Sequence, residues 1–465
     1  MTERELAEQV VELVRRSAGP GAHAEATVSR KDLALTRFAN SFIHQNVAGS
    51  SVEVRLRVHV DGRTATGSGS LTSPDGLREL VERTLVAARL CPPDPAWPGL
   101  TPPTPMPSAP AADEATAYAE PDERAARVRA FVDAAGGLET AGFCRTSQEF
   151  AAFANTAGHT AYGRMVEAAM DGIARTGGVD GVARLAADRL ADLDGAVLGA
   201  QAAAKARAGV DPVELPPGRY EVVFEPAAVA DLLQNLSYWG FNGKAYAERK
   251  SFAELGAAQF DPAVTLVDDP LAGSGLPFDI EGTPRGALPL VTAGTTTGVA
   301  HDRRTAAAVG GTSTGHASGE SPTFGPFPVN IRLLPATAHA HTTGPERAGG
   351  EVTGPVADPD TAALVAGVRR GLLVSDLWYT RVLDPKALTV TGLTRNGVWL
   401  VEDGVVTRAV RNLRFTQAYP RALAPGAVLG LGRVPVRQPA RTEPVWWSTP
   451  PLHLASWNFT GNASG

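Results

Sequence analysis

The sequence is poor in cysteine and lysine and contains no long apolar run. Two cysteines, Cys91 and Cys144, are too few for a framework of several disulfides or for a zinc site of four thiolates. The 43 basic residues face 49 acidic ones, so the formal net charge is -6 and no basic surface for nucleic acid is expected. No run reaches the ~18 apolar residues of a membrane span. The acidic first residues do not match a signal peptide, and we expect a cytoplasmic protein without a membrane or nucleic-acid partner.

The first 210 residues show both helical and strand periodicity. Thr2 and Glu5 form a capping-box pattern, and Asp61-Gly62 is typical of a hairpin turn after an alternating strand. The patterns predict helices from Thr2 to Gly19, from Pro74, over Glu123–Ala135 and over about Val182–Arg207, and strands over Val52–Val60 and Glu149–Arg164. We therefore expect an N-terminal α+β domain, residues 1–210, with helical layers on a mixed sheet.

Proline separates two parts of this first domain. Residues 91–110 hold nine prolines, which can neither continue a helix nor pair within a sheet. The segment 91–121 is therefore expected to cross the surface as an extended, semi-rigid chain.

The second half, residues 211–465, is rich in strand patterns. Predicted strands are Tyr220–Phe224, Val264–Val267, Val329–Leu334, Leu388–Thr391, Val398–Val401 and Leu413–Phe415. Asn396-Gly397 and Asp403-Gly404 are the dipeptides of tight hairpins. The fold class predicted for the whole chain is α+β, with a large β-rich C-terminal domain that is barrel-like or sandwich-like.

Three local patterns could carry chemistry. Gly311–Gly315 fits the G-x-S-x-G nucleophile elbow around Ser313, but the glycines and prolines that follow exclude the helix that this elbow needs, which favours a mobile glycine-rich loop. His339 and His341 could share a metal with His301 or His316, although a solvated strand face is the simpler interpretation. An acidic run could bind a hard cation or form turns, and turns are favoured: Asp268, Asp269, Asp279, Glu281 and Asp302.

An apolar helix beginning at Pro226 ends in the aromatic segment Ser237–Gly243. Its aromatic residues Tyr238, Trp239 and Phe241 could belong to the core or to a contact surface, and large aromatic side chains are usually buried.

Several short segments of the second half stand in a distinctive order: Pro217–Pro226, Ser251-Phe252, Val267–Pro270, Pro277–Pro284 and His301-Asp302. Two more flank them, Arg37–Gln45 and Gly392–Glu402. In this order they resemble the TldD/PmbA family, whose older name is modulator of DNA gyrase. The resemblance covers most of the chain.

The resemblance implies one of two branches, which pair into a heterodimeric peptidase. The TldD type carries an H-E-x-x-x-H zinc motif and a later cysteine ligand, and the PmbA (TldE) type lacks them. Counting back from Ser251-Phe252 places the motif positions at Gln234, Asn235 and Trp239. Indole has no lone pair for a metal, an amide is a poor zinc ligand, and Asn235 cannot act as the carboxylate base. The last cysteine is Cys144, so no later cysteine ligand exists.

This chain is thus expected to be the metal-free subunit, inactive alone, with zinc in a TldD-like partner and small unfolded or linear peptides as substrates. Trp239, Phe241, Ser313 and His316 are candidates for the subunit interface or the peptide cavity. A homodimer of the isolated chain remains an open alternative. Two other functions are kept: a peptide-binding or scaffold protein without hydrolysis, and a serine hydrolase that uses Ser313.

Overall fold

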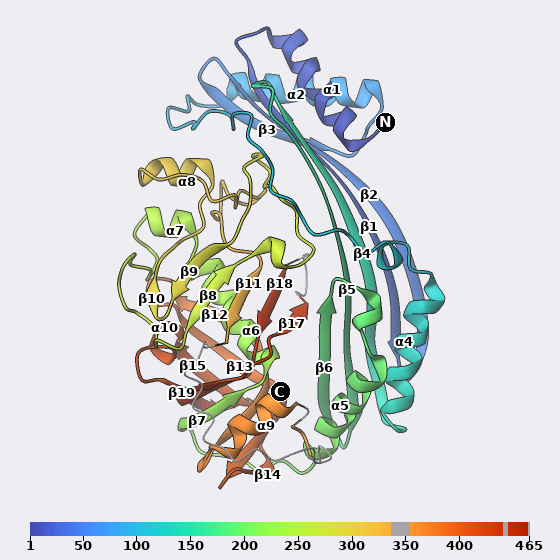
Figure 1. Cartoon of the computed structure of the whole chain (residues 1–465), viewed down its shortest axis with the longest axis vertical. Coiled ribbons are helices and arrows are strands. Elements are labelled where there is room, and N and C mark those ends of the chain that lie inside the picture. The colour runs from blue at the N-terminus through green and yellow to red at the C-terminus, as the bar shows by residue number, and fades with distance from the viewer. Residues whose placement is uncertain (336–353, 357, 440–444, 464–465) are drawn as a thin grey trace.

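The computed structural model describes residues 1–335, 354–356, 358–439 and 445–463 (Figure 1). It confirms the α+β class and contains three sheets among these residues. Strands from residues 23–187 form one sheet, and strands that begin at residue 218 or later form the other two. The proposed division into domains near residue 210 remains a prediction.

The N-terminal sheet is a long, curved, six-stranded layer in the order β3-β2-β1-β4-β5-β6 (Figure 1). Its strands are β1 (His23–Ala39), β2 (Phe42–Val60), β3 (Arg63–Gly69), β4 (Glu139–Asn155), β5 (Thr160–Thr176) and β6 (Val179–Ala187). Every pairing is antiparallel, rather than mixed as expected from the sequence. Parallel pairs occur instead in the other two sheets.

Helices cover only one face of this sheet (Figure 1). The helices α1 (Glu3–Ala18) and α2 (Pro74–Leu90) pack on one end, and α4 (Pro121–Ala134) and α5 (Gly195–Ala208) pack on the other. Because side chains alternate along a strand, Ala26 and Val28 face the helices while Thr27 and Ser29 face the C-terminal half. The predicted capping box of Thr2 and Glu5 is present at the start of α1.

Two predicted elements of this half are wrong in extent. The strand pattern over Glu149–Arg164 spans a turn, in which the Asn155 side chain accepts hydrogen bonds from the N–H groups of Ala157 and His159. The alanine-rich stretch predicted as one helix from Val182 is a strand as far as Ala187. Its helix, α5, begins only after the cap residue Asp194, since pairing with β5 outweighs the helix propensity of alanine.

The proline-rich crossing has neither helix nor strand between residues 91 and 113, and then forms the short helix α3 (Glu114–Ala117). It is fastened to the C-terminal half by several side-chain contacts, among them hydrogen bonds from Arg303 to the Pro98 and Leu100 carbonyls. Asp94 forms an ion pair with Arg304 at 2.6 Å, and the Thr101 hydroxyl donates to the Glu281 carbonyl at 2.7 Å. The crossing therefore joins the two halves as well as separating two parts of the sequence.

The C-terminal half contains two mixed sheets. The first has the order β10-β9-β8-β11-β18-β17: β8 (Thr265–Asp268), β9 (Leu288–Thr292), β10 (Thr295–Thr296), β11 (Ile331–Leu334), β17 (Val436–Pro439) and β18 (Trp446–Thr449). The second has the order β12-β7-β19-β15-β13-β14, with β16 on β19: β7 (Gly218–Phe224), β12 (Arg370–Asp384), β13 (Thr389–Glu402), β14 (Val405–Ala409), β15 (Leu413–Ala418), β16 (Val428–Leu431) and β19 (Leu452–Asn462). Pairing of β12 with β13 closes this sheet on itself, which is the expected barrel-like form.

The smaller helices of this half are α6 (Pro226–Asn235), α7 (Gly243–Ala247), α8 (Arg303–Ala308), α9 (Pro359–Ala366) and α10 (Tyr419–Ala422). Short helical turns are η1 (Leu190–Asp192), η2 (Leu236–Gly240) and η3 (Pro270–Ala272). Among the described residues, no helix has both the length and the apolar character needed to cross a membrane.

The two predicted hairpins differ in outcome. Asp403-Gly404 turns β13 into β14, as predicted. Asn396-Gly397 lies inside the continuous strand β13, so that prediction is wrong. The two residues have φ values of 59° and 133° and form a bulge opposite Val374–Asp376. The dipeptide supplied the positive φ that a turn needs, and the fold uses it for a bulge.

Candidate functional site

The helix α6 carries Gln234 and Asn235, which the resemblance places at the first two motif positions, and is fixed at its start by a buried ion pair. Glu225 precedes Pro226, and its carboxylate accepts hydrogen bonds from Lys205 and from the Ser375 hydroxyl, both at 2.6 Å. Lys205 belongs to α5 and Ser375 to β12, on which α6 packs. The pair therefore holds α6 against both halves of the molecule.

Asn235, at the glutamate position of the motif, is buried in a hydrogen-bond network. Its amide nitrogen donates to the main-chain oxygen of Asp231 at 3.0 Å, to the Asp231 carboxylate at 3.2 Å and to the Thr380 hydroxyl at 3.4 Å. The Tyr419 hydroxyl donates to the same carboxylate at 3.2 Å. Burial and the nearby Asp231 charge raise the pKa of Tyr419, so its hydroxyl remains a donor. The network uses these polar groups for packing.

Trp239, at the second histidine position, lies in the π-helical turn η2, which the N–H of Phe241 closes on the Leu236 carbonyl at 2.8 Å. Its half-buried ring packs edge-on against Phe324 with centroids 5.3 Å apart. Gln234 is half-buried on α6. Amide and indole side chains in these contacts do not fit a zinc ion. Across the described ranges, no group of three or more His, Cys, Asp or Glu side chains is placed to hold a metal.

Phe241, expected at an interface or a cavity, is instead fully buried in the C-terminal core. Its ring lies 5.7 Å from that of Phe252 and 6.4 Å from that of Phe260. Because the side chain has no accessible surface in the single chain, it cannot meet a ligand or partner without rearrangement of the core. Trp239 keeps some accessible surface.

Ser313 has no histidine as a base. Its hydroxyl donates to the His301 carbonyl at 3.2 Å and accepts from the Gly315 N–H at 3.3 Å, and within the described part of the chain no histidine ring is bonded to it. Helix α8 precedes the residue and no helix directly follows it. A nucleophile needs an adjacent base, so the geometry does not favour the serine-hydrolase alternative.

His316 is the middle of a buried chain of hydrogen bonds. One ring nitrogen contacts the Thr314 hydroxyl and the other the Asp268 carboxylate, each at 2.8 Å. Asp268 also accepts the N–H groups of Val329 and Asn330. Burial alone would raise the pKa of Asp268, but the hydrogen bonds from His316 and the Asn330 N–H and the charges of His316 and Arg285 lower it overall. Asp268 thus anchors the glycine-rich loop, while His339 and His341 lie outside the described residues.

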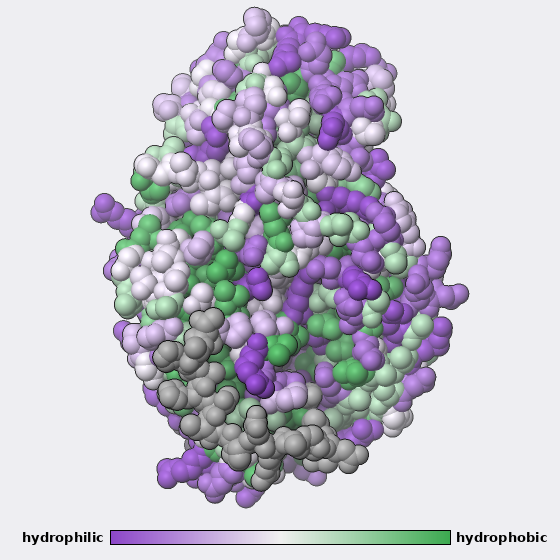
Figure 2. Space-filling view, viewed as in Figure 1, coloured by the Kyte–Doolittle hydropathy of each residue, from purple (hydrophilic) through white to green (hydrophobic). Residues whose placement is uncertain are grey.

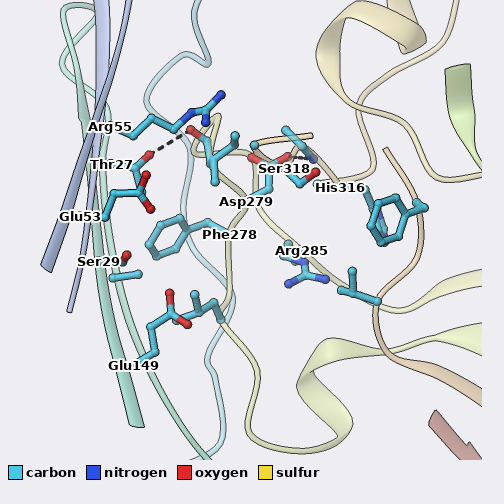
Figure 3. Close-up of a pocket in the computed structure, with 18 residues that line it drawn as sticks. Thr27, Ser29, Glu53, Arg55, Glu149, Phe278, Asp279, Arg285, His316 and Ser318 are labelled. Carbon is cyan, nitrogen blue, oxygen red and sulfur yellow. Dashed lines mark hydrogen bonds between the residues drawn. The ribbon is translucent and has the colours of Figure 1, made fainter. Parts of the chain in front are cut away.

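A cavity of about 300 Å³ lies between the uncovered face of the N-terminal sheet and two loops of the C-terminal half, residues 276–285 and 315–319 (Figure 3). Thr27, Ser29, Glu53 and Glu149 line it from the strands, and Arg285, His316 and Ser318 line it from the loops. Of the four candidates named for the subunit interface or the peptide cavity, His316 alone belongs to this lining, and Asp279 of the acidic run also belongs to it. The face of the molecule shown in Figure 2 mixes apolar and hydrophilic residues.

Asp279 forms part of the cavity wall and holds the two loops together. Its oxygens accept the N–H groups of Glu281 and Thr283, both at 2.9 Å, and of Ala317 at 2.8 Å. Burial, reinforced by the nearby Glu281 charge, raises the pKa of Asp279 to about 7 despite these donors. The sequence interpretation of this acid as a turn residue agrees with these contacts.

Sequence reasoning missed Arg285 and Arg55 as cavity residues. The alternation of Glu53, Arg55 and Arg57 with apolar residues was read only as the polar face of a half-buried strand. Arg285 directly follows the segment Pro277–Pro284, which was noted for its family likeness. Both arginines lie in segments with a recognisable pattern, but residues 53–57 and 277–285 come together only in the folded chain.

Known structures share this architecture. The crystal structure of TldE from Thermococcus kodakarensis matches with a TM-score of 0.82 and 18% identity over 98% of this chain and 100% of that one. A protein described as a modulator of DNA gyrase from Thermotoga maritima matches with a TM-score of 0.77 and 17% identity, over 98% and 99% of the two chains. A counterpart from Bacteroides thetaiotaomicron gives 0.77 and 17%, over 98% of each chain. No curated protein sequence matches significantly.

The fold is therefore that of the TldE and gyrase-modulator structures. The family model for the PmbA/TldA metallopeptidase C-terminal domain matches residues 217–461, which is more than half of the chain. The chain belongs to this PmbA/TldD family, as its ordered segments predicted.

Proposed function

We propose that this chain is the metal-free, PmbA (TldE)-type subunit of a two-subunit zinc peptidase in the cytoplasm. The observation that carries the proposal is the chemistry of the motif positions. Asn235 is engaged by Asp231 and Thr380, and Trp239 packs on Phe324, so neither can hold or activate a zinc-bound water. In a family named for metallopeptidases, such a chain needs a partner that supplies the metal.

An open strand edge beside the motif suits capture of a peptide. Strand β7 pairs with β12 only from Gly371 to Val374, and over the described residues no other strand pairs with that edge from Tyr379 to Asp384, where β12 is no longer buried. Thr380, on this stretch, contacts Asn235 of α6. An extended peptide could add to such an edge through main-chain hydrogen bonds, which do not depend on its sequence. The proposed substrates are accordingly small unfolded or linear peptides.

The test is co-expression with a relative from the same source that carries the H-E-x-x-x-H motif. We expect the two chains to co-purify, zinc to remain with the partner when the subunits are separated, and peptide hydrolysis to require both. Changing the first motif histidine of the partner to alanine should abolish zinc binding and hydrolysis. Gln234→Ala, the matched change in this chain, should leave both intact. A partner that does not co-purify and is equally active alone would contradict the proposal.

A second candidate function is that of a peptide-binding or scaffold protein without hydrolysis. The cavity favours this function because this chain lines it, and a peptide could bind there without a metal. This function predicts that the isolated chain binds peptides and that no turnover occurs with the partner present. Hydrolysis by the reconstituted pair distinguishes the two functions.

A further inference from the structure

Arg285 differs from three other arginines that lie between the two halves, Arg57, Arg184 and Arg437. Arg57 pairs with Glu25 and Glu281, Arg184 pairs with Asp171 and Asp376, and Arg437 pairs with Glu167 and Asp188. All four side chains have a buried Nε atom without a hydrogen-bond partner, but of the four only the guanidinium of Arg285 forms no hydrogen bond or ion pair with a described residue. Arg285 is half-buried, and the remaining donors of its guanidinium face the cavity, where they could bind an anionic ligand.

The acids near Arg285 are already engaged. Asp268 binds His316 and two main-chain N–H groups, and Asp279 binds three. Burial lowers the pKa of Arg285 overall, although the charges of Asp268 and Asp279 oppose this, and a guanidinium stays protonated in either case. The guanidinium therefore keeps its positive charge, and its N–H groups donate to no described residue.

Gly315 holds the stem of Arg285 in place. Its φ is +75°, and an added Cβ would lie 2.6 Å from the Pro284 carbonyl oxygen and 2.9 Å from Cγ of Arg285. The glycine-rich loop thus packs closely against this side chain. Arg285 lines the cavity together with Phe278 and Asp279 (Figure 3). The position of the guanidinium is set by packing before any ligand arrives.

The rest of the wall is largely apolar. Its apolar members are Ala151, Leu276, Phe278, Ile280, Phe327 and Val329. The volume of about 300 Å³ lies at the lower end of the range for ligand sites. Such a space suits the end of a chain better than a long segment. The guanidinium of Arg285 and the neighbouring apolar part of the wall together match a residue that has both a carboxylate and an apolar side chain, while Glu53 and Glu149 line the wall from the sheet strands.

We propose that Arg285 binds the C-terminal carboxylate of a peptide whose last residue is apolar, and that this residue fills the cavity. A bidentate guanidinium–carboxylate pair satisfies the unused donors, and the side chain of the ligand packs on Phe278 and Leu276. The site belongs to this chain alone and does not depend on zinc or on a partner, so it can be tested separately from the proposed function.

The test is calorimetric titration of the full chain with an N-acetylated peptide that ends in leucine, as the free acid and as the C-terminal amide. We expect the acid to bind at least about tenfold more tightly than the amide. Arg285→Gln should remove this difference, and Arg285→Lys should restore part of it because the charge remains without the fork. Arg55→Gln is the matched control, since Arg55 lines the same cavity from β2 but lies among the charges of Glu53, Glu25 and Glu281. It should change affinity less than about threefold.

The proposal fails if acid and amide bind alike, if Arg55→Gln and Arg285→Gln weaken binding equally, or if inorganic phosphate competes as well as the peptide acid does. Equal loss would indicate general positive charge, and competition by phosphate would indicate a simple anion site. A thermal unfolding curve for each variant shows whether it is folded, and Arg285→Lys keeps the test decisive if Arg285→Gln does not fold. If the wild-type chain binds the peptide acid as expected but the reconstituted pair does not hydrolyse peptides, the proposed function is wrong and the Arg285 site is not.

Discussion

Two polar regions of this molecule contrast in how their groups are paired. Around α6, Lys205, Glu225, Asn235 and Tyr419 all bond to other side chains, and the region is closed. In the cavity, Arg285 is held by packing but has no bonding partner among the described residues. The difference shows that Asn235, which the family resemblance places at a position of the metal motif, is part of the scaffold here. The unused binding capacity of the chain lies elsewhere.

The largest effect is expected at the closed region. Lys205→Ala should lower the free energy of unfolding by about 3–5 kcal/mol, because it leaves the buried Glu225 carboxylate without its cation. Denaturant titration measures this. Lys250→Ala is the control, since the Lys250–Glu248 pair is largely exposed and should be worth less than about 1 kcal/mol. Similar losses in both variants would show that the ion pair at α6 is not special.

Glu25, which lies near the cavity, should make the free energy of unfolding depend on pH. Burial raises the pKa of Glu25 to about 7, Glu281 adds to the rise, and Arg57 opposes it. The folded chain then binds this proton more tightly than the unfolded chain, so the stabilisation is complete below about pH 4.5 and is lost as the pH rises through 7. Relative to Glu25→Gln, the wild type should lose about 2 kcal/mol between pH 5 and 8.

Using this difference between variants cancels the opposite trend from His59, His301 and His453, whose pKa values are lowered chiefly by burial. Unfolding measured in denaturant at each pH provides the comparison. A difference that does not change with pH would show that Glu25 is ionised throughout and is fully compensated by Arg57.

A smaller effect is expected from Asn235→Asp, which keeps the shape of the side chain. The new carboxylate would face that of Asp231 and lose the donated hydrogen bonds, at a cost of about 1–3 kcal/mol near pH 8. Because like charges raise the pKa of such a carboxylate, the cost should shrink as the pH falls to 5. Chemical denaturation at the two pH values is the measurement. A variant as stable as the wild type at pH 8 would show that the hydrogen bonds donated by Asn235 do not contribute to stability.

The smallest effect on stability is expected in the cavity. Arg285→Gln removes a charge that no described residue bonds, so the free energy of unfolding should change by less than about 1 kcal/mol. Arg184→Gln, which strips the buried Asp376 of its cation, should cost at least about 2 kcal/mol in the same thermal and denaturant assays. A large loss for Arg285→Gln would place this residue in the scaffold and remove the contrast between the two regions.

Much of the local structure was readable because its causes are local. The capping box of Thr2, the hairpin at Asp61-Gly62 and the apolar helix after Pro226 were all predicted from neighbouring residues. The predictions that failed depended on distant strands. Val182–Ala187 joins β5 instead of a helix, and Asn396-Gly397 forms a bulge because β13 continues along β12 on both sides of it.

The sequence by itself determined the α+β class, the family and the side chains at Gln234, Asn235 and Trp239, because these depend on residue identity and order. The tertiary structure alone decided that Phe241 is core and that Asn235 is sealed by Thr380 and Tyr419. It also brought Arg285 to the uncovered face of the N-terminal sheet, in a cavity that sheet residues between positions 27 and 151 line. Pairing in a folded chain depends on which distant groups meet, and no local pattern records that.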